Sequence, residues 1–540
     1  MPDSGAVLLR GTPVSPGLAR GPLVLLAQAA HATQRRQGSA EEEARQLAGA
    51  LEAAVTELAS LRDRAEDPDS GLLLLFQIEM LGDAVFTKPA YEAITAGMSA
   101  EGAWREAMER EVREYQEADD LYFQARASDL RDMRDRVLRH LSGEAPAPIA
   151  EGSIVVGTDL PPSRFLEIEW RGGGIALTAG SPNSHVAMLA RSRGVPMLIG
   201  LEHSELAGHS EALLDSENGI LVASPDAASA SQFASRQVMA QVARADEARY
   251  LGERAATANG ERVQLLINVA DVNELANLDP ASCDGIGLVR TELLVGKAEL
   301  QDEERQYRAY RRILEWARGR PVTIRTLDAG GDKPIAGYTV HGESNPFLGV
   351  RGVRLSLDHP AILACQLRAL ARAAVIGPLK VMVPMVTAPR ELEQVRMLLD
   401  AAVAQLRDAG VDCEIPELGM MVEVPAAALA IDLFDADFLS IGSNDLIQYV
   451  TACSRDSAAL AALQDPLQPA VLRLIREVVE RALVRAIPVS LCGDMASDAR
   501  CVPALLDVGL RSLSVAPAAI ARVKRAIAQH RTAAAERRGE

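Results

Sequence analysis

The chain has 540 residues, of which 48% are hydrophobic and 24% are charged, enough for three or four domains or one large barrel with attachments. Its formal net charge of −18 argues against non-specific nucleic-acid binding, which requires a basic face. The six cysteines are scattered through the second half without a Cys-x-x-Cys pair. This spacing predicts neither disulfides nor a zinc site and favours a reducing cytoplasm.

The first part of the chain changes character after about thirty residues. Residues 1–30 alternate short apolar runs with the turn-rich TPVSPGLARG, which predicts short strands. From 33 to 141 apolar residues recur every three or four positions, the pattern of amphipathic helices. Such helices between two β-rich stretches indicate an inserted subdomain, although a plain bundle has the same pattern.

No basic and apolar leader precedes these elements. The longest apolar runs, such as GLLLLF at 71–76, are too short to cross a bilayer. The sequence therefore predicts a soluble, cytoplasmic protein without a membrane segment.

A loop of small residues runs directly into a helix in the stretch SPNSHVAMLARSRGVP (181–196). A helix N-terminus offers unpaired N–H groups and a positive potential, so it favours an anion. His185 lies at this junction, where its imidazole is placed to meet a phosphate. A surface histidine at the start of a capped helix is the alternative.

The flanking residues suggest how this region is organised. A short Pro/Ala linker at 142–150 is followed by strands and turns up to residue 225. We expect residues 142–225 to pack with residues 1–32 as one β/α domain that is discontinuous in sequence. Residues 226–258 are predicted to be a helical linker.

Short apolar runs alternate with amphipathic helices in the last part of the chain. Eight runs recur, at 263–269, 285–291, 321–328, 379–386, 417–424, 437–445, 488–495 and 512–517. Eight strands alternating with helices over about 280 residues are typical of a (β/α)₈ TIM barrel. The sequence therefore predicts a barrel over 259–540, with an open doubly wound sheet as the alternative.

Polar side chains stand where these strands end, which is the end that carries the active site in such barrels. They are Arg290 after the second strand, Arg325 and Asp328 at the third, Glu423 at the fifth, Asn444 and Asp445 at the sixth, and Cys492 at the seventh. Buried hydrophobic strands have no packing reason to place such groups at their tips. Their recurrence at one face therefore predicts a site.

These residues make a coherent chemical set. The two arginines are suited to gripping phosphate or carboxylate oxygens. Glu423 and Asp445 from adjacent strands are suited to holding Mg²⁺, with an ion pair to an arginine as the alternative. Cys492, in the turn LCGDMAS, is placed to move a proton, although a buried apolar cysteine is the common case.

With these residues in this order, the chain resembles a known family, the phosphoenolpyruvate–protein phosphotransferases, or enzyme I of the bacterial phosphotransferase system. The resemblance runs from VSPGLARG (14–21) to about residue 525. Its motifs are SHVAMLARSRGVP (184–196), GIGLVRTE (285–292), IRTLDAGGDK (324–333), NPFLGVRGVR (345–354), GMMVEVPAA (419–427), SIGSNDLIQY (440–449) and LCGDMAS (491–497).

The resemblance implies a reaction and assigns residues to it. His185 would take the phosphoryl group of phosphoenolpyruvate and pass it to a histidine of the phosphocarrier protein HPr, with release of pyruvate. This is the first step of sugar uptake by the phosphotransferase system. The substrate-binding positions would be Arg290, Arg325, Asn444, Asp445 and Arg455, with Arg351 beside them; Glu423 and Asp445 would bind Mg²⁺, and Cys492 would be the proton donor.

The resemblance also implies partners and motion. The helices at 33–141 would dock HPr, and the barrel would form a homodimer. Because His185 and the barrel belong to different domains, the phosphohistidine domain would swivel between two docking positions. The segment at 226–255 is expected to be helical and to act as the hinge.

The sequence departs from the family pattern at a few positions. The loop before His185 is Gly-Ser-Pro-Asn-Ser, where the family usually has Gly-Gly-x-Thr-Ser. Asp494 stands in place of a usual Glu, Ser443 in place of a usual Thr, and Gln77 at a position often held by His. We expect these changes to affect rate and partner preference rather than reaction type.

Two other functions are compatible with parts of this pattern. A dikinase or synthase needs its own ATP-binding domain, and the chain has neither a GxxxxGK[ST] motif nor enough sequence before His185 for one. A non-catalytic sensor would bind phosphoenolpyruvate or pyruvate without turnover. The presence of His185, Cys492 and both metal carboxylates favours the enzyme.

Overall fold

The computed structural model describes most of the chain. The described residues are 6–26, 38–64, 68–117, 121–143, 148–180, 184–201, 206, 208–270, 272–276, 278–294, 300–331, 333, 335, 337–340, 342–454, 460 and 463–532. The chain divides into two compact units, Met1–Ala240 and Gln241–Glu540, which are taken separately below.

The first unit contains an eight-stranded mixed sheet with the order β1-β8-β7-β3-β4-β5-β6-β2. Its strands are β1 (Val7–Arg10), β2 (Thr12–Ser15), β3 (Leu18–Leu25), β4 (Ile154–Gly157), β5 (Gly174–Leu177), β6 (Met197–Ile199), β7 (Glu211–Asp215) and β8 (Ile220–Ala223). Strand β3 pairs in parallel with β4, although more than a hundred residues separate them. The two β-rich stretches on either side of the helical region thus share one sheet.

Two helices cover one face of this sheet. These are α6 (Pro162–Glu167) and α7 (His185–Arg193). Alternate strand residues face opposite ways: Val155 and Ile175 pack against the two helices, whereas Ile154 packs with residues of β7 and β8. Both faces are apolar because both are covered.

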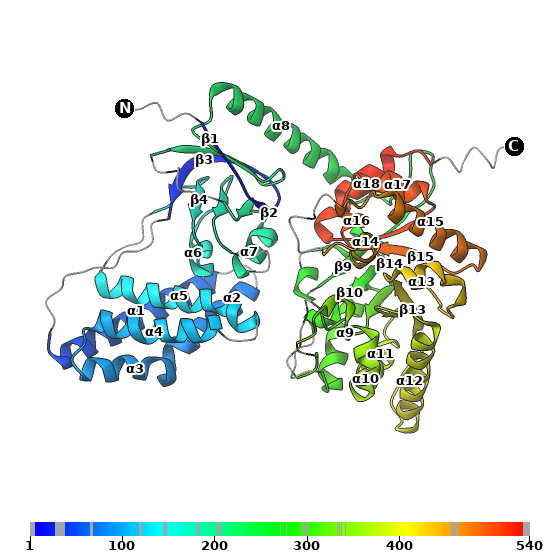
Figure 1. Cartoon of the computed structure of the whole chain (residues 1–540), viewed down its shortest axis with the longest axis horizontal. Helices are drawn as coiled ribbons and strands as arrows, with labels where there is room; N and C mark the ends of the chain where they lie inside the picture. The colour runs from blue at the N-terminus through cyan, green and yellow to red at the C-terminus, as the bar shows by residue number, and fades with distance from the viewer. Residues whose placement is uncertain are drawn as a thin grey trace. The chain divides into compact units, whose positions relative to one another are not determined.

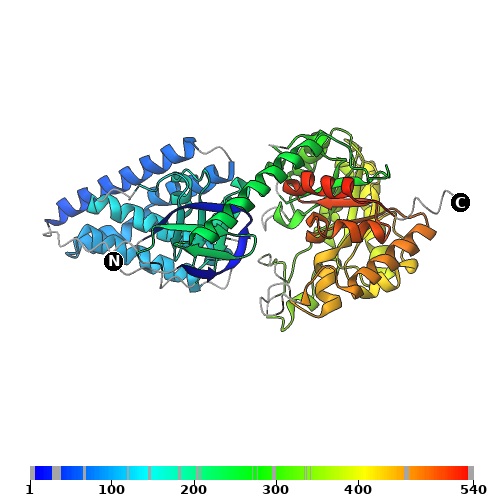
Figure 2. The same cartoon turned by 90° about the horizontal axis from the view of Figure 1, so that it is seen from above.

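Five helices between β3 and β4 form a bundle, drawn in blue and cyan in Figures 1 and 2. They are α1 (Ala40–Arg64), α2 (Pro68–Gly82), α3 (Ala84–Thr95), α4 (Ala100–Glu117) and α5 (Leu121–Ser142). Their apolar stripes meet in one core that includes the fully buried Leu58, Trp104 and Leu130. The helical periodicity in the sequence therefore reflects a single packed core.

A buried arginine joins this bundle to the sheet region. Arg136 of α5 donates to Ser163 Oγ at 2.5 Å and to Glu167 Oε1 at 2.8 Å, both on α6, and pairs with Glu57 of α1 at 2.7 Å. Burial alone would disfavour the charged guanidinium, but the nearby carboxylate of Asp132, followed by those of Glu167 and Glu57, raises the pKa of Arg136. The network fixes the bundle on the β/α region of the same unit.

The second unit is a closed barrel of eight parallel strands in the order β9 to β16 around the ring. The strands are β9 (Gln264–Val269), β10 (Ile286–Val289), β11 (Val322–Arg325), β12 (Leu379–Val383), β13 (Glu417–Val422), β14 (Leu439–Gly442), β15 (Val489–Cys492) and β16 (Ser512–Val515). Strand β16 pairs with β9 from Ser512↔Gln264 to Val515↔Ile267, and this pairing closes the ring.

Helices surround the barrel and bury its outer face (Figure 1). They are α9 (Glu303–Ala317), α10 (Val353–Asp358), α11 (Pro360–Ala373), α12 (Pro389–Asp408), α13 (Pro425–Leu429), α14 (Ser443–Thr451), α15 (Pro469–Val484), α16 (Asp494–Ser497), α17 (Val502–Asp507) and α18 (Ile520–Gln529). The predicted fold class is confirmed, and closure of the ring excludes the open doubly wound sheet.

The predicted helical linker is only partly helical. Helix α8 (Ala227–Tyr250) carries the boundary between the two units. The prediction of helix up to residue 255 is wrong for its last five residues, which form turns and irregular chain around Gly252. Glycine destabilises a continuing helix. Across the described ranges, no helix combines the length and apolar character needed to cross a membrane.

Candidate active site

The closed barrel brings five of the predicted site residues to one rim. Arg325 and Cys492 are the last residues of β11 and β15, and Arg290 directly follows β10. Glu423 follows β13, and Asp445 lies in the first turn of α14 after β14. Because all eight strands are parallel, their carboxyl ends lie at the same end of the barrel.

Charged side chains at this rim form one network, here called the barrel-end cluster. Its members are Glu292, Arg325, Asp328, Lys333, Arg351, Glu423 and Asp445. Its first part surrounds Arg325, whose Nη2 donates to Glu292 Oε1 at 2.5 Å and whose Nη1 lies 3.1 Å from Asp328 Oδ2. Lys333 Nζ donates to the same two carboxylates at 3.0 Å each.

Arg351 links this part of the cluster to Asp445. The Arg351 side chain is fully buried, and Nη2 donates to Asp328 Oδ2 at 3.2 Å. Arg351 also donates to both carboxylate oxygens of Asp445, from Nη1 to Oδ1 at 3.2 Å and from Nη2 to Oδ2 at 3.3 Å. Asp445 therefore makes the arginine ion pair that the sequence left open. The three cations Arg325, Lys333 and Arg351 hold the pKa of Asp328 well below its ordinary value, against the effect of burial.

Glu423 differs from the other carboxylates of the cluster. It is 1% exposed, and its Oε1 accepts a hydrogen bond from the backbone N–H of Met385 at 2.7 Å. Burial, followed by repulsion from Asp445 and Asp328, raises the pKa of Glu423 to about 8. The cluster contains four carboxyl groups and three cations. With Glu423 protonated these charges balance, and its ionisation would leave a negative excess that a bound cation would relieve.

The donor set suits a hard divalent cation with few protein ligands. Within the described ranges, no three His, Cys, Asp or Glu side chains gather as a metal site. Glu423 and Asp445 thus offer at most a pair of carboxylates, which is the usual share that a protein contributes when substrate oxygens and water complete the coordination of Mg²⁺. Burial is the main cause of the raised pKa of Glu423 and repulsion from Asp445 adds to it, so a cation bound at the pair would favour the ionised form.

Two buried arginine atoms also lack partners. Within the barrel-end cluster, the Nε atoms of Arg325 and Arg351 are buried without a hydrogen bond, as is Glu292 Oε2. A buried N–H without a partner is costly unless a ligand meets it. Both donors therefore fit a site that binds an oxyanion.

Cys492 lies inside the barrel and is 1% exposed. Its neighbours there are Leu288, Met382, Met421 and Phe438. Burial in this apolar layer raises the pKa of the Cys492 thiol. The thiol is therefore protonated at neutral pH, the state that a proton donor needs.

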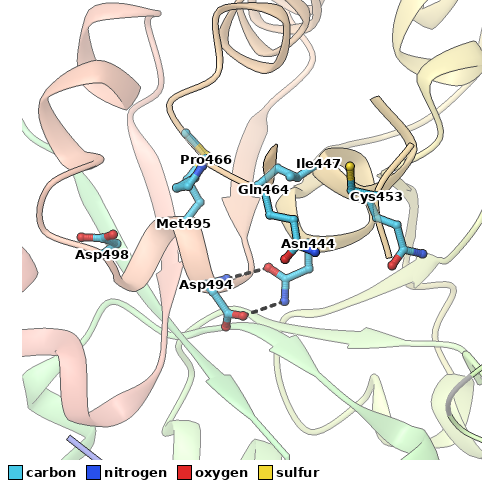
Figure 3. A pocket seen from close by; sticks show the side chains of 9 residues that line it. Asn444, Ile447, Cys453, Gln464, Pro466, Asp494, Met495 and Asp498 are labelled. Carbon is cyan, nitrogen blue, oxygen red and sulfur yellow. Dashed lines mark hydrogen bonds between the residues drawn. The ribbon is translucent and has the colours of Figure 1, made fainter. Parts of the chain in front are cut away.

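Asn444 is held by the turn that follows Cys492. The backbone N–H of Asp494 donates to Asn444 Oδ1 at 2.9 Å, and Asn444 Nδ2 donates to Asp494 Oδ2 at 3.1 Å, as the dashed lines in Figure 3 mark. Gly493, which separates Cys492 from Asp494, has φ +100°, and a Cβ at Gly493 would lie 2.4 Å from Ser443 Oγ and 2.8 Å from Asn444 Oδ1. The turn at Gly493 approaches the start of α14 so closely that it requires glycine. A cavity of about 190 Å³ opens beside Asn444 and Asp494.

The remaining predicted residues lie elsewhere. His185 is the first residue of α7 in the first unit, and Ser184 caps the helix by accepting a hydrogen bond from the N–H of Ala187 at 3.3 Å. The structure describes the backbone of His185 and not its side chain. Residues 181–183 of the preceding loop and Arg455 lie outside the described residues.

Sequence reasoning missed two members of the cluster. Glu292 and Lys333 belong to the motifs GIGLVRTE and IRTLDAGGDK, but the sequence pattern assigns no role to either residue. The available signal was their charge, since Glu292 follows Arg290 after β10 and Lys333 lies in the loop after β11. Glu292 pairs with Arg325 and with Lys333, 33 and 41 positions away, because the neighbouring strands β10 and β11 lie side by side.

Models of three protein families match the chain. They are described as PEP-utilising enzyme, N-terminal, over residues 10–126; PEP-utilising enzyme, mobile domain, over 149–219; and PEP-utilising enzyme, PEP-binding domain, over 244–532. The last alone covers more than half of the chain and includes the whole barrel.

Proteins with similar sequences carry names that agree with these family models. The phosphoenolpyruvate-protein phosphotransferase of Geobacillus stearothermophilus is 35% identical over 503 residues, 91% of this chain and 87% of that protein. Those of Cupriavidus necator and Staphylococcus carnosus are 36% and 33% identical, over 96% and 89% of this chain and 94% and 86% of their own lengths. With likeness of this extent, the chain belongs to the phosphoenolpyruvate-protein phosphotransferase family.

Proposed function

We propose that this protein transfers the phosphoryl group of phosphoenolpyruvate to His185 and then to a histidine of HPr, releasing pyruvate. As a member of its family, the chain is an enzyme of phosphoenolpyruvate-dependent protein phosphorylation in the phosphotransferase system, and the family uses a divalent metal. The residues, the metal ion and the acceptor protein are our proposals. The observation that carries them is the barrel-end cluster, where arginine Nε donors without partners belong to the same network as the buried carboxyl groups of Glu423 and Asp445.

We assign substrate binding to the cations of the rim. Arg290, Arg325 and Arg351 would bind the phosphate and carboxylate oxygens, and the amide of Asn444 would orient the substrate. Arg455 is assigned the same role on sequence grounds alone.

Glu423 and Asp445 would hold Mg²⁺. The bound ion would neutralise substrate charge at the oxygens nearest the two carboxylates. The protein holds the two carboxylates in position for the ion. The Met385 N–H fixes one oxygen of Glu423, and Arg351 fixes both oxygens of Asp445. These contacts leave the second carboxylate oxygen of Glu423, Oε2, as the atom that would bind the metal ion.

The chemistry is an in-line phosphoryl transfer followed by a proton transfer. A ring nitrogen of His185 attacks phosphorus, an N–P bond forms, and the bridging P–O bond breaks. The electron pair of that bond leaves with the enolate of pyruvate. The thiol of Cys492 then protonates the methylene carbon to give pyruvate. The N-terminal position of His185 on α7 supports its role, because helix N–H groups stabilise a phosphoryl anion.

Replacement of Cys492 by alanine is expected to separate the two half-reactions. Pyruvate formation should slow by about 10² to 10⁴-fold, because the positioned acid is lost. Phosphoryl exchange between phosphohistidine and HPr should be unchanged, since no enolate takes part in it. Both rates are measured on the same preparation, with Cys365→Ala as a control for loss of a buried thiol. Equal losses in both half-reactions would contradict the assignment.

The pH dependence of the wild type follows from the same thiol. A proton donor is active below its pKa and is lost as the pH rises through it. Because burial raises the pKa of Cys492 above the ordinary 9.0, we expect no loss of pyruvate formation from this group between pH 7 and pH 9. The pH profile of the Cys492→Ala variant supplies the baseline.

Replacement of Asp494 by alanine is expected to weaken substrate binding. It removes the carboxylate that accepts from Asn444 Nδ2 and keeps the backbone N–H that donates to Asn444 Oδ1. Loss of one such bond is worth about 1 kcal/mol, so the KM for phosphoenolpyruvate should rise about fivefold with little change in kcat. Asp494→Glu, which restores the usual family residue, should recover the wild-type KM. An unchanged KM in Asp494→Ala would show that Asn444 does not depend on this contact.

Further expectations concern partners and location. We propose that HPr docks on helices α1 to α5, that the barrel forms a homodimer and that the protein is cytoplasmic. The proximity of the bundle to α6, through Arg136, supports docking near the phosphohistidine helix, because α6 and α7 cover the same face of one sheet.

Turnover with purified components tests the function. With phosphoenolpyruvate, Mg²⁺ and HPr, pyruvate should accumulate in proportion to phosphorylated HPr. Without added divalent metal, both products should be lost together. A sensor that binds phosphoenolpyruvate without turnover would release no pyruvate above background, and that result would overturn the proposal.

A further inference from the structure

A serine lies beside Cys492 in the barrel interior. Ser440 is the second residue of β14 and is fully buried. Its neighbours Leu439 and Ile441 belong to the apolar layer between strands and helices. Because strand side chains alternate, Ser440 points to the inside, where Cys492 lies on the adjacent strand β15.

The two side chains are in direct contact. Ser440 Oγ donates a hydrogen bond to Cys492 Sγ at 3.5 Å, and the thiol donates to the carbonyl oxygen of Ile441 at 3.6 Å. Ser443 Oγ donates to the Cys492 carbonyl at 3.0 Å, which holds the backbone of the same residue. Strand β14 and the start of α14 therefore fix the orientation of the cysteine.

We propose that Ser440 is a positioning residue for Cys492, which directs the sulfur and stabilises the thiolate formed when it protonates the enolate. This inference rests on the proposed role of Cys492. In the step, a C–H bond forms at the methylene carbon and the S–H bond breaks, with its electron pair left on sulfur. Ser440 keeps its proton and donates a hydrogen bond to the thiolate, which regains a proton from solvent after pyruvate leaves.

The surroundings of the sulfur explain why one hydroxyl matters. Leu288, Met382, Met421 and Phe438 pack around Cys492 and offer it no N–H or O–H donor from their side chains. Charged groups act from the rim: Arg325 and Arg290 favour the thiolate, and Glu423 disfavours it. A hydrogen bond to an ionised atom is roughly twice as strong as one to a neutral atom. The contact from Ser440 should therefore strengthen when the sulfur becomes negative.

Ser440→Ala tests the proposal in both half-reactions. Pyruvate formation should slow about tenfold, as expected when a charged atom loses one hydrogen bond, while phosphoryl exchange with HPr stays at the wild-type rate. The alkaline limb of the pH profile should move to higher pH, because a less stable thiolate means a higher thiol pKa. Ser440→Thr keeps the hydroxyl and should recover the rate and the profile.

A matched control distinguishes this role from packing. Ser514 is an equally buried barrel serine on β16, but its Oγ donates to Asn268 Oδ1 at 2.7 Å. Ser514→Ala should leave the pH profile unmoved. A Ser440→Ala enzyme with an unmoved profile, or with equal losses in both half-reactions, would make Ser440 merely structural and overturn the inference.

Cys492→Ala separates failure of this inference from failure of the proposed function. If Cys492→Ala still forms pyruvate at the wild-type rate, the proton-donor role itself is wrong. If Cys492→Ala loses pyruvate formation and Ser440→Ala does not, only the role of Ser440 is wrong.

Discussion

A chain with alanine in place of His185 is expected to fold and to lose phosphoryl transfer entirely. Helix α7 is capped by Ser184, so the cap survives the change, and alanine is a good helix former. The nucleophile is removed, so pyruvate release and phosphorylation of HPr should both fall by more than about a thousandfold. Coupled assays of the two products measure this loss, and a thermal melt checks the fold.

A second histidine of the same unit provides the control. His209 lies 2.7 Å from Ser224 Oγ through its Nδ1 and belongs to no part of the proposed site. His209→Ala should retain turnover. If His185→Ala turns over like the wild type, another residue carries the phosphoryl group and the assignment of His185 is wrong.

Replacement of Arg351 by methionine is expected to have the largest effect on stability. The change removes the arginine that pairs with Asp445 and one of the three cations around Asp328, and the buried Asp445 carboxylate left without its partner should cost about 3 to 5 kcal/mol in the free energy of unfolding. Turnover should be lost as well, because both the proposed substrate contact and the partner of Asp445 disappear. Urea denaturation of the two proteins measures the difference.

The pH dependence gives this prediction a second readout. Asp328 has a lowered pKa in the folded wild type, so its contribution to stability is complete above the ordinary value of 3.8 and is lost only as the pH falls below it. In Arg351→Met the carboxylates that faced the arginine should bind protons more readily in the folded state. The difference in the free energy of unfolding between the wild type and Arg351→Met should therefore narrow as the pH falls from 7 toward 4.

A double variant identifies the cause. Arg351→Met with Asp445→Asn removes the charge of the carboxylate that has lost its arginine, so it should regain part of the lost stability without regaining activity. A double variant less stable than Arg351→Met alone would mean that the cost is one of packing and not of charge.

The barrel could be predicted from sequence because its strands are short apolar runs bounded by turns. Details at the strand ends could not. The run 379–386 predicts a strand to its end, but β12 stops at Val383, because Pro384 follows and Met385 takes a φ of +58°. This break turns the Met385 N–H toward Glu423, where it holds one carboxylate oxygen.

Most of the charged residues at the rim could be predicted, although Glu292 and Lys333 were not, and the pairing of these residues could not be predicted. Arg351 and Asp445 are 94 positions apart, and only closure of the ring brings them into contact. The same holds for Ser440, whose position in an apolar strand is typical of a core residue and whose contact with Cys492 crosses to the next strand. Local patterns identify which residues lie at the rim, and the fold decides which of them meet.

The central claim is that phosphoenolpyruvate phosphorylates His185 in the presence of Mg²⁺. Intact-mass analysis after incubation with both, followed by peptide mapping, tests it most directly. The account predicts one acid-labile phosphoryl group on the peptide that contains His185. A folded wild-type protein that gains no phosphoryl group, or gains an acid-stable one on another peptide, would contradict it.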